Sequence, residues 1–514
     1  MTSVFASPRE NGVWGQLWYG ESVWSAGLWY LFSVACLLWV FLANGVPLYY
    51  FDTGGYLLQG ERFLDIVGLM PDDGAAATQS SAAGGAGTGA QKDNTVQGGR
   101  SLIYGITLAL FHTFMGFASV VFAQAALLVV AVWLSVRVLL RVHPGHLSVA
   151  ATTGLCILAA SLGSAAFYTA FLMPDIFAPI QLLMLAALMT LLPGMRWWET
   201  ALAFILASTS VVMHPSHLLI ALVLVPVAPL AAFLSGSRRV VLSSALVAAV
   251  ALIGVTERFA FVVATETVTD SEVVYRPFIT ARLIVDGPGL EYLDDVCPQA
   301  GLATCELRKL LVRPRQITAS HIIFAQSEEL GSLRLLPEET QERITEEQVI
   351  LLRGVLMTHP ISFVRSVVGN TMTQLFFVNA YVTLPDGGVT DRLRRLIPEE
   401  SKELTDARLT SRIGWLPWFA LFQLVIYGLS LVTIIAGVFL RSVGAGWPIR
   451  TFAATVFVGI LANSLVCGAV SQPSDRYGAR IVFLLPVLAI LFFSTKRASD
   501  ARSSRAGPTG EGLT

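Results

Sequence analysis

The chain has 514 residues, of which 54% are hydrophobic and 13% are charged, and its net charge at pH 7 is −1. Soluble proteins carry about 25% charged residues, and here the deficit is concentrated in apolar runs of membrane-spanning length. This composition excludes an ordinary soluble domain, and the near-neutral charge suggests no nucleic-acid partner. We therefore predict an all-α polytopic membrane protein embedded in a lipid bilayer.

Ten apolar segments are long enough to be predicted as transmembrane helices. They are residues 24–49, 118–140, 147–170, 176–193, 199–213, 217–234, 240–263, 414–440, 451–470 and 479–494. These segments divide the chain into four predicted parts. The parts are an N-terminal membrane domain (1–264), an extracytoplasmic or juxtamembrane, mainly helical region (265–412), C-terminal spans (413–494) and a tail (495–514).

The first span leads into a predicted outer loop over residues 50–117. It begins within the aromatic stretch 49–56 (YYFDTGGY), which suits the headgroup level of a membrane. Residues 72–99 are rich in Ala, Gly, Ser and Thr and are predicted to be disordered. Residues 101–117 are apolar but short, which predicts an interfacial helix.

The polar region 265–412 contains one strong helix signal. Pro337 and the glutamates after it predict a helix from 337 to 357, because proline and acidic side chains favour a helix amino terminus. The apolar segment 361–382 is broken by Asn370 and Gln374, so it is either a membrane-surface helix or a partial span.

Two cysteines of this region, Cys297 and Cys305, are close in sequence and fall on the predicted outer side, which favours a disulfide between them. No CxxC or Cys/His ligand spacing occurs in the chain, so a metal site is not predicted.

The distribution of arginine and lysine predicts the orientation in the membrane. Cytoplasmic loops carry an excess of these residues, and both termini are cytoplasmic if that rule is applied here. The basic residues that then share the cytoplasmic side are Arg137, Arg141, Arg196, Arg238, Arg239, Arg441, Arg450, Lys496, Arg497, Arg502 and Arg505.

Four polar clusters then fall at the outer ends of helices. They contain Asp52, Asp175, the pair His214 and His217, and the pair Arg476 and Arg480. Ionisable residues at the edge of a membrane are costly and are therefore functional candidates. Each also has a purely structural interpretation: Asp52 or Asp175 as a helix cap, the histidines as polar loop, and Arg476 as part of a loop ion pair.

The order of these parts resembles the class C glycosyltransferase superfamily, which includes bacterial aminoarabinose transferases and protein mannosyltransferases. The resemblance rests on Asp52 and Tyr56 after the first span, a return segment over residues 99–117 that contains Arg100, the later Asp175, and the pair Arg476-Tyr477. It implies a bacterial inner-membrane enzyme that uses a sugar carried on a polyprenyl phosphate. The chain lacks the Asp-x-Asp pair of the oligosaccharyltransferase branch, which argues against an obligatory metal.

The resulting hypothesis is a transferase acting at the periplasmic face on an envelope glycan, lipid or protein, with no cofactor. Asp52 would be the general base and Asp175 would orient a substrate. The substrate-binding candidates are Tyr56, Arg100, His214, His217, Arg476, Tyr477 and Arg480, with the arginines holding the phosphate leaving group. Two alternatives remain open: a transporter or flippase of lipid-linked material, and a catalytically inactive member that serves as a partner subunit.

Overall fold

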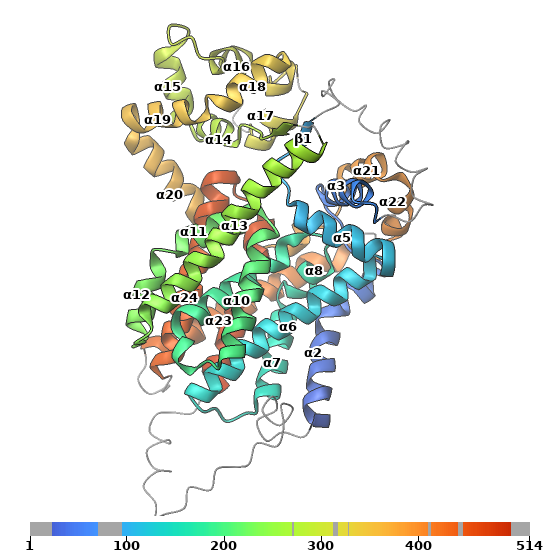
Figure 1. Cartoon of the computed structure of the whole chain (residues 1–514), viewed down its shortest axis with the longest axis vertical. Coiled ribbons are helices and arrows are strands. Elements are labelled where there is room, and N and C mark those ends of the chain that lie inside the picture. The colour runs from blue at the N-terminus through green and yellow to red at the C-terminus, as the bar shows by residue number, and fades with distance from the viewer. Residues whose placement is uncertain are drawn as a thin grey trace, which may run out of the picture.

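The computed structural model describes residues 23–69, 95–269, 272–311, 317–326, 328–409, 413–439 and 446–494. Almost all regular structure in these ranges is helical (Figure 1). Two short strands, β1 (Thr95–Gln97) and β2 (Glu272–Val274), pair in parallel with Thr95 opposite Glu272. Residues 72–94 of the tract predicted to be disordered lie outside the described residues, whereas its last five residues form β1 and a turn.

The helices of the first half form most of a tall apolar bundle (Figure 1). They are α2 (Val23–Asn44), α3 (Thr53–Ile66), α5 (Leu102–Met115), α6 (Phe117–Val142), α7 (Val149–Leu162), α8 (Ala165–Ala170), α9 (Phe177–Thr190), α10 (Trp197–Val212), α11 (Pro215–Leu224), α12 (Val227–Leu234) and α13 (Val240–Thr269). The bundle is completed by α23 (Leu416–Phe439), α24 (Trp447–Leu465), α25 (Asp475–Val482) and α26 (Leu484–Ser494).

Six helices in the described part of the chain are long and apolar enough to cross a membrane. A seventh crossing results if α11 and α12, which are bent by 55° relative to each other, are counted as one span. The remaining three predicted spans correspond to α7, to α9 with the 3₁₀ turn before it, and to α10, which are shorter apolar helices. The structure therefore supports a helical membrane protein, while ten crossings remain a prediction.

The physical reason why the sequence predicts more spans than the structure has helices of spanning length is clearest in α9. Every residue of α9 is buried inside the bundle, so its sequence is apolar on all sides although the helix meets no lipid. Pro174 precedes this helix, and Pro193 with Gly194 follows it in a 3₁₀ turn, so the chain cannot extend it at either end.

A separate helical unit stands above one end of the bundle and has its own core (Figure 1). Its helices are α14 (Phe278–Asp286), α15 (Pro288–Val296), α16 (Thr304–Leu310), α17 (Ala319–Phe324), α18 (Glu338–Glu346) and α19 (Gln348–Thr358). We call residues 278–358 the upper unit. It is joined back to the bundle by α20 (Pro360–Phe376).

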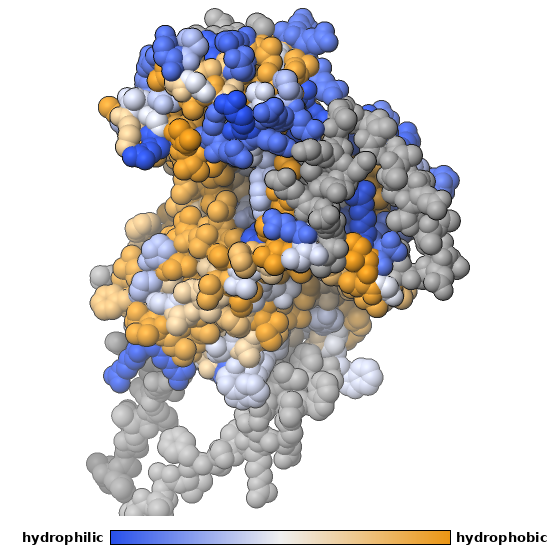
Figure 2. Space-filling model, turned by 45° about the horizontal axis from the view of Figure 1, so that its top comes forward, coloured by the Kyte–Doolittle hydropathy of each residue, from blue (hydrophilic) through white to orange (hydrophobic). Residues whose placement is uncertain are grey.

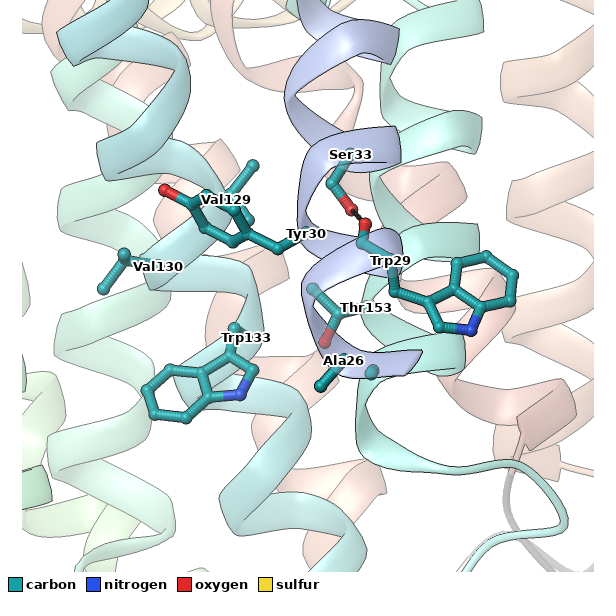
Figure 3. Close-up of a pocket in the computed structure, with 9 residues that line it drawn as sticks. Ala26, Trp29, Tyr30, Ser33, Val129, Val130, Trp133 and Thr153 are labelled. Carbon is teal, nitrogen blue, oxygen red and sulfur yellow. Dashed lines mark hydrogen bonds between the residues drawn. The ribbon is translucent and has the colours of Figure 1, made fainter. Parts of the chain in front are cut away.

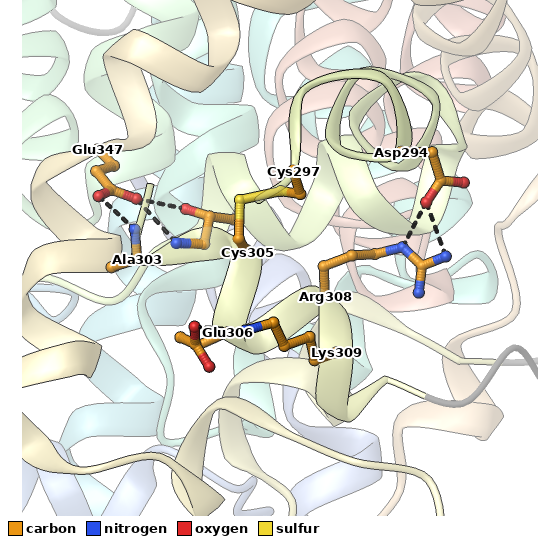
Figure 4. The surroundings of a disulfide bond; sticks show 9 residues. Asp294, Cys297, Ala303, Cys305, Glu306, Arg308, Lys309 and Glu347 are labelled. Carbon is orange, nitrogen blue, oxygen red and sulfur yellow. Dashed lines mark hydrogen bonds and ion pairs between the residues drawn. A yellow bond between two sulfur atoms is a disulfide. The ribbon is translucent and has the colours of Figure 1, made fainter. Parts of the chain in front are cut away.

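The single helix predicted over 337–357 is two helices, α18 and α19, which meet at Glu347. The Glu347 carboxylate accepts hydrogen bonds from the backbone N–H groups of Ala303 and Thr304, at 2.7 and 2.9 Å (Figure 4). It thereby satisfies donors at the start of α16 that would otherwise lack a partner. Beside it, Cys297 and Cys305 form a disulfide with their Cα atoms 5.7 Å apart.

The polar region 265–412 does not fold as one part. Its last helices, α21 (Gly387–Leu396) and α22 (Pro398–Thr405), contribute Val389, Leu393 and Leu404 to the core of the bundle rather than to the upper unit. This hairpin lies beside α3, which places it next to Asp52 (Figure 1).

The opposite end of the bundle is closed by a buried ion-pair network. Glu199 at the start of α10 pairs with Arg137 and Arg141 at the end of α6, at 2.8 and 2.6 Å. The Arg137 guanidinium also lies over the rings of Trp133 and Trp198. The arginine-bearing end of α6 and the α9–α10 loop are thus at the other end of the bundle from Asp52.

Candidate functional site

Asp52 and Arg100 are brought together by the packing of α3 against α5. Asp52 immediately precedes α3, and Arg100 lies two residues before α5, whose first turn is capped by Ser101. The Arg100 guanidinium rests directly on Gly55, where any side chain would collide with it. This contact leaves Nη2 of Arg100 3.4 Å from Oδ1 of Asp52.

Two further glycines set the distance between these helices. A Cβ atom on Gly60 would collide with the carbonyl oxygen of Gly105, so the backbones of α3 and α5 touch at this point. Tyr56 is buried in the same interface, with its ring centroid 5.1 Å from that of Tyr104. Tyr56 therefore positions α3 and is not accessible from the surface, so the predicted substrate contact of Tyr56 is not supported by this geometry.

The second half of the site is an ion-pair cluster inside the protein. Asp175 lies in a 3₁₀ turn before α9, and Arg476 and Arg480 are one turn apart on α25. Arg476 reaches Asp175 through Nε at 3.0 Å and Nη2 at 2.8 Å, and Nη1 of Arg480 reaches it at 3.1 Å. The side chains of Asp175 and Arg480 are 2% and 0% exposed, so this is a buried pairing.

Arg476 connects the two halves. Its third nitrogen, Nη1, lies 3.4 Å from Oδ2 of Asp52, so one guanidinium spans the two carboxylates predicted from sequence. The Asp52 side chain is 35% exposed, which makes it the carboxylate of the cluster that solvent or a ligand can reach. The ring of Tyr50 lies 4.8 Å from the Arg476 guanidinium, and Tyr477 lies beside both Arg476 and Arg480.

The two histidines have different positions. Nδ1 of His214 and the hydroxyl of Ser216 share a hydrogen bond of 2.8 Å. The same hydroxyl accepts from Nη2 of Arg480 at 3.2 Å, so His214 borders the cluster. Burial, followed by the neighbouring His217 and Arg480, holds the pKa of His214 well below its usual range. His217 is fully buried and its Nδ1 is bonded to the carbonyl of Ser210. A direct substrate contact from His217 is therefore not supported.

Several contributors were not predicted from the sequence. Arg392 on α21 donates from Nε to the carbonyl oxygen of Phe51 at 3.1 Å, beside Asp52. Asn463 on α24 accepts from Nη2 of Arg480 at 2.8 Å, and the Tyr168 hydroxyl donates to the backbone carbonyl of Arg476. Arg392 comes from a region with many charges and no span end nearby, so nothing in its sequence context distinguished it.

The site carries more positive than negative charge. Arg100, Arg392, Arg476 and Arg480 gather around Asp52 and Asp175, an excess of two positive charges. Desolvation opposes the ionisation of Asp52, but Arg100 and Arg476 outweigh it and hold the pKa of Asp52 below its ordinary value. Asp52 is therefore ionised at neutral pH, and the cluster as a whole attracts anions.

No group of three or more His, Cys, Asp or Glu side chains is arranged to hold a metal ion within the described ranges. An apolar cavity of about 200 Å³ lies elsewhere, between the first half of α2 and helices α6 and α7 (Figure 3). Trp29, Tyr30 and Trp133 line it, and the hydroxyl of Ser33 is bonded to the carbonyl of Trp29. Asp52 follows the other end of α2, so this cavity is not part of the charged site.

Comparison of the chain with family models, with curated proteins and with solved structures finds no match.

Proposed function

We propose that the chain is an integral-membrane glycosyltransferase that moves a sugar from a polyprenyl-phosphate donor to an envelope acceptor. The observation that carries this proposal is the bridge from Asp52 through Arg476 to Asp175 at one end of an apolar bundle. A partly exposed carboxylate there adjoins arginines whose combined charge favours a phosphate. The proposal places this end of the bundle at the periplasmic face of a bacterial inner membrane.

The chemistry would use each group of the cluster in a distinct way. The acceptor hydroxyl attacks the anomeric carbon, the bond between that carbon and the phosphate oxygen breaks, and the phosphate leaves with the electron pair. Asp52 takes the hydroxyl proton, while Arg476 and Arg100 stabilise the negative charge that develops on the phosphate. Asp175 keeps Arg476 and Arg480 in place and neutralises part of their charge.

The resting contacts of Asp52 fit this sequence of events. Asp52 is paired with Arg100 and Arg476 at 3.4 Å each, and these are also the phosphate ligands in the proposed reaction. A bound phosphate would compete for both guanidinium groups. Asp52 would then no longer be paired with the two arginines that lower its pKa. Its pKa would rise when the donor is bound, which would make it a stronger base.

A second candidate is a transporter of lipid-linked material. The observation in its favour is the broken helix α11–α12, since discontinuous helices are common at transporter binding sites. Against it, the charged groups of the site gather at one end of the bundle, and the Arg137–Glu199 network closes the other end. A transporter has no need of a general base, so the two candidates differ in their dependence on Asp52.

The test is sugar transfer by purified protein in proteoliposomes that contain a polyprenyl-phosphate sugar and an envelope extract as acceptor. General-base catalysis contributes about 10²–10⁴-fold, so Asp52→Asn should lower turnover by that amount. Asp391→Asn is the matched control, because Asp391 lies on the neighbouring α21 and its side chain is 72% exposed. Native-rate transfer by folded Asp52→Asn protein would refute the proposal, and donor movement across the bilayer without transfer would favour the transporter.

A further inference from the structure

Helix α20 connects the upper unit to the bundle, and one of its faces is fixed by specific contacts. This face packs against α24 and against the π-helical turn that extends α24 (Val466–Ser471). Gln374 is buried there, and its amide group both donates to the carbonyl and accepts from the N–H of Ser474, at 2.9 Å each. The backbone two residues before Arg476 is therefore attached to α20.

The other face of α20 is an exposed apolar row, which we call the α20 row. Its members recur at intervals of three or four residues, which places them on one side of a helix about 25 Å long. They are Ile361, Val364, Val368, Met372 and Phe376, with 84%, 57%, 52%, 48% and 80% of their surface exposed. Large contiguous apolar surfaces of this kind mark an interaction site.

The surroundings of the row indicate what it contacts. Leu461, Leu465 and Val470 are also exposed, and they belong to α24 and its extension, which is one of the candidate membrane spans packed against α20. Figure 2 shows hydrophobic surface that rises from the broad belt of the bundle toward the upper unit without a polar break. The row is thus continuous with the surface that faces lipid.

Polar side chains along the same helix are arranged as lipid contact requires. Arg365 is the one charged residue of α20, and it lies near the amino end, where a long side chain can extend to the headgroups. In the carboxyl half, Thr371 and Gln374 are buried, and the hydroxyl of the exposed Thr373 donates to the carbonyl oxygen of Gly369 within the helix, at 2.9 Å.

We propose that the α20 row is immersed among phospholipid acyl chains and holds the upper unit against the membrane. The helix has 17 residues and is not long enough to cross the bilayer with its apolar row. We therefore place it at the membrane face that bears Asp52, to which its contact with Ser474 attaches it. This inference is independent of the proposed enzymatic activity, since it rests only on the α20 row and its continuity with α24.

The test is thiol labelling of cysteines introduced one at a time into the native chain, in proteoliposomes, with a water-soluble maleimide. Val364→Cys, Val368→Cys and Met372→Cys report on the row, Lys309→Cys is the water-exposed control in the upper unit, and Leu429→Cys is the lipid-exposed control on α23. Maleimides react with the thiolate, which does not form in hydrocarbon, so the row variants should label about tenfold or more slowly than Lys309→Cys. The native protein provides the background from Cys36, Cys156 and Cys467.

A second measurement separates lipid from a second copy of the chain. Vesicles that contain a phospholipid with a photoreactive acyl chain should give lipid adducts on residues 360–376 after irradiation, as they should on α23. Labelling of the row at the rate of Lys309→Cys would overturn the inference by showing that the row is in water. Slow labelling without lipid adducts would overturn it as well, because another protein surface would then cover the row.

Discussion

The change Asp175→Asn removes the carboxylate that two buried arginines share. Asn has the same shape, but its amide group carries no charge, and its nitrogen would place a donor against the donors of Arg476 and Arg480. After the change, Arg476 would keep one carboxylate neighbour, Asp52 at 3.4 Å, beside the neutral rings of Tyr50 and Tyr477. Arg480 would retain Asn463 and Ser216, both of which are neutral. Of the two carboxylates around these guanidinium groups, only the partly exposed Asp52 would remain, and it lies beside Arg476 alone.

The expected cost is large because the pairing is buried. Removal of one partner of a buried ion pair costs about 3–5 kcal/mol, and two arginines lose their partner here, so we expect the upper part of that range. Asp52→Asn is the matched comparison, since it is the same substitution in the same cluster. The Asp52 side chain is 35% exposed, and exposed pairs contribute about 0–1 kcal/mol, so its effect on stability should be small.

The assay is thermal unfolding of both variants in nanodiscs, followed by tryptophan fluorescence. Asp175→Asn should unfold at a clearly lower temperature than the native protein, and Asp52→Asn close to it. The double variant Asp175→Asn/Arg480→Met should recover part of the loss, because the charge of Arg480, which no longer has a carboxylate beside it, is then absent. Equal unfolding temperatures for native and Asp175→Asn protein would show that Asp175 does not hold the arginines as the geometry requires.

Three further outcomes are expected. Gly105→Ala should force α5 away from Gly60, lowering both stability and transfer, whereas Gly99→Ala, where a Cβ atom meets open space, should leave both unchanged. Burial, followed by the neighbouring Glu400, raises the pKa of Glu61 to about 7. Folding therefore favours protonated Glu61. This contribution to the free energy of unfolding is complete below the unfolded pKa of Glu61 and is lost as pH rises through about 7. Amide hydrogen exchange in residues 387–405, which include Glu400, should therefore become faster as pH rises to about 7, after correction for the intrinsic exchange rate. Glu61→Gln protein should not show this increase. Replacement of Cys297 and Cys305 by Ala should lower the stability of the upper unit by at most about 2–3 kcal/mol, because the disulfide closes a short loop. Amide hydrogen exchange in residues 288–311 should become faster while sugar transfer is unchanged. A loss of sugar transfer would contradict this prediction.

The spans that could be predicted from sequence are those whose helix is long enough to cross a membrane in one piece. Helices α2, α6, α13, α23 and α24 are long apolar runs with polar ends, and length alone identifies them. Helices α7, α9 and α10 are equally apolar but have only 14, 14 and 16 residues, and α9 is enclosed by other helices along its whole length. A pattern of apolar residues on all sides does not separate lipid contact from burial in protein, so the break points of these segments were not predictable.

The polar site was predictable only in part. Asp52, Asp175, Arg476 and Arg480 stand at helix ends on one predicted side, and the structure brings their side chains together. The direction in which a side chain points depends on packing, which is why Tyr56 and His217 were predicted to bind substrate although both are buried in the interior. Arg392 reaches the site because α21 folds back on α3, a long-range contact that no local pattern encodes.

In the proposed reaction, Arg100 and Arg476 would serve both Asp52 and the donor phosphate, so donor binding would change the base strength of Asp52, with a kinetic consequence. Asp52 must be ionised to accept a proton, so the rate rises with pH through the pKa of Asp52. In the free enzyme Arg100 and Arg476 hold that pKa below its ordinary value. With donor bound, the phosphate takes over the two arginines and adds its own negative charge, and both changes raise the pKa of Asp52. Because kcat/KM reports the free enzyme and kcat the complex, the acidic limb of the kcat profile should lie at higher pH than that of kcat/KM. Coincident limbs would mean that the phosphate does not displace Asp52 from its arginines.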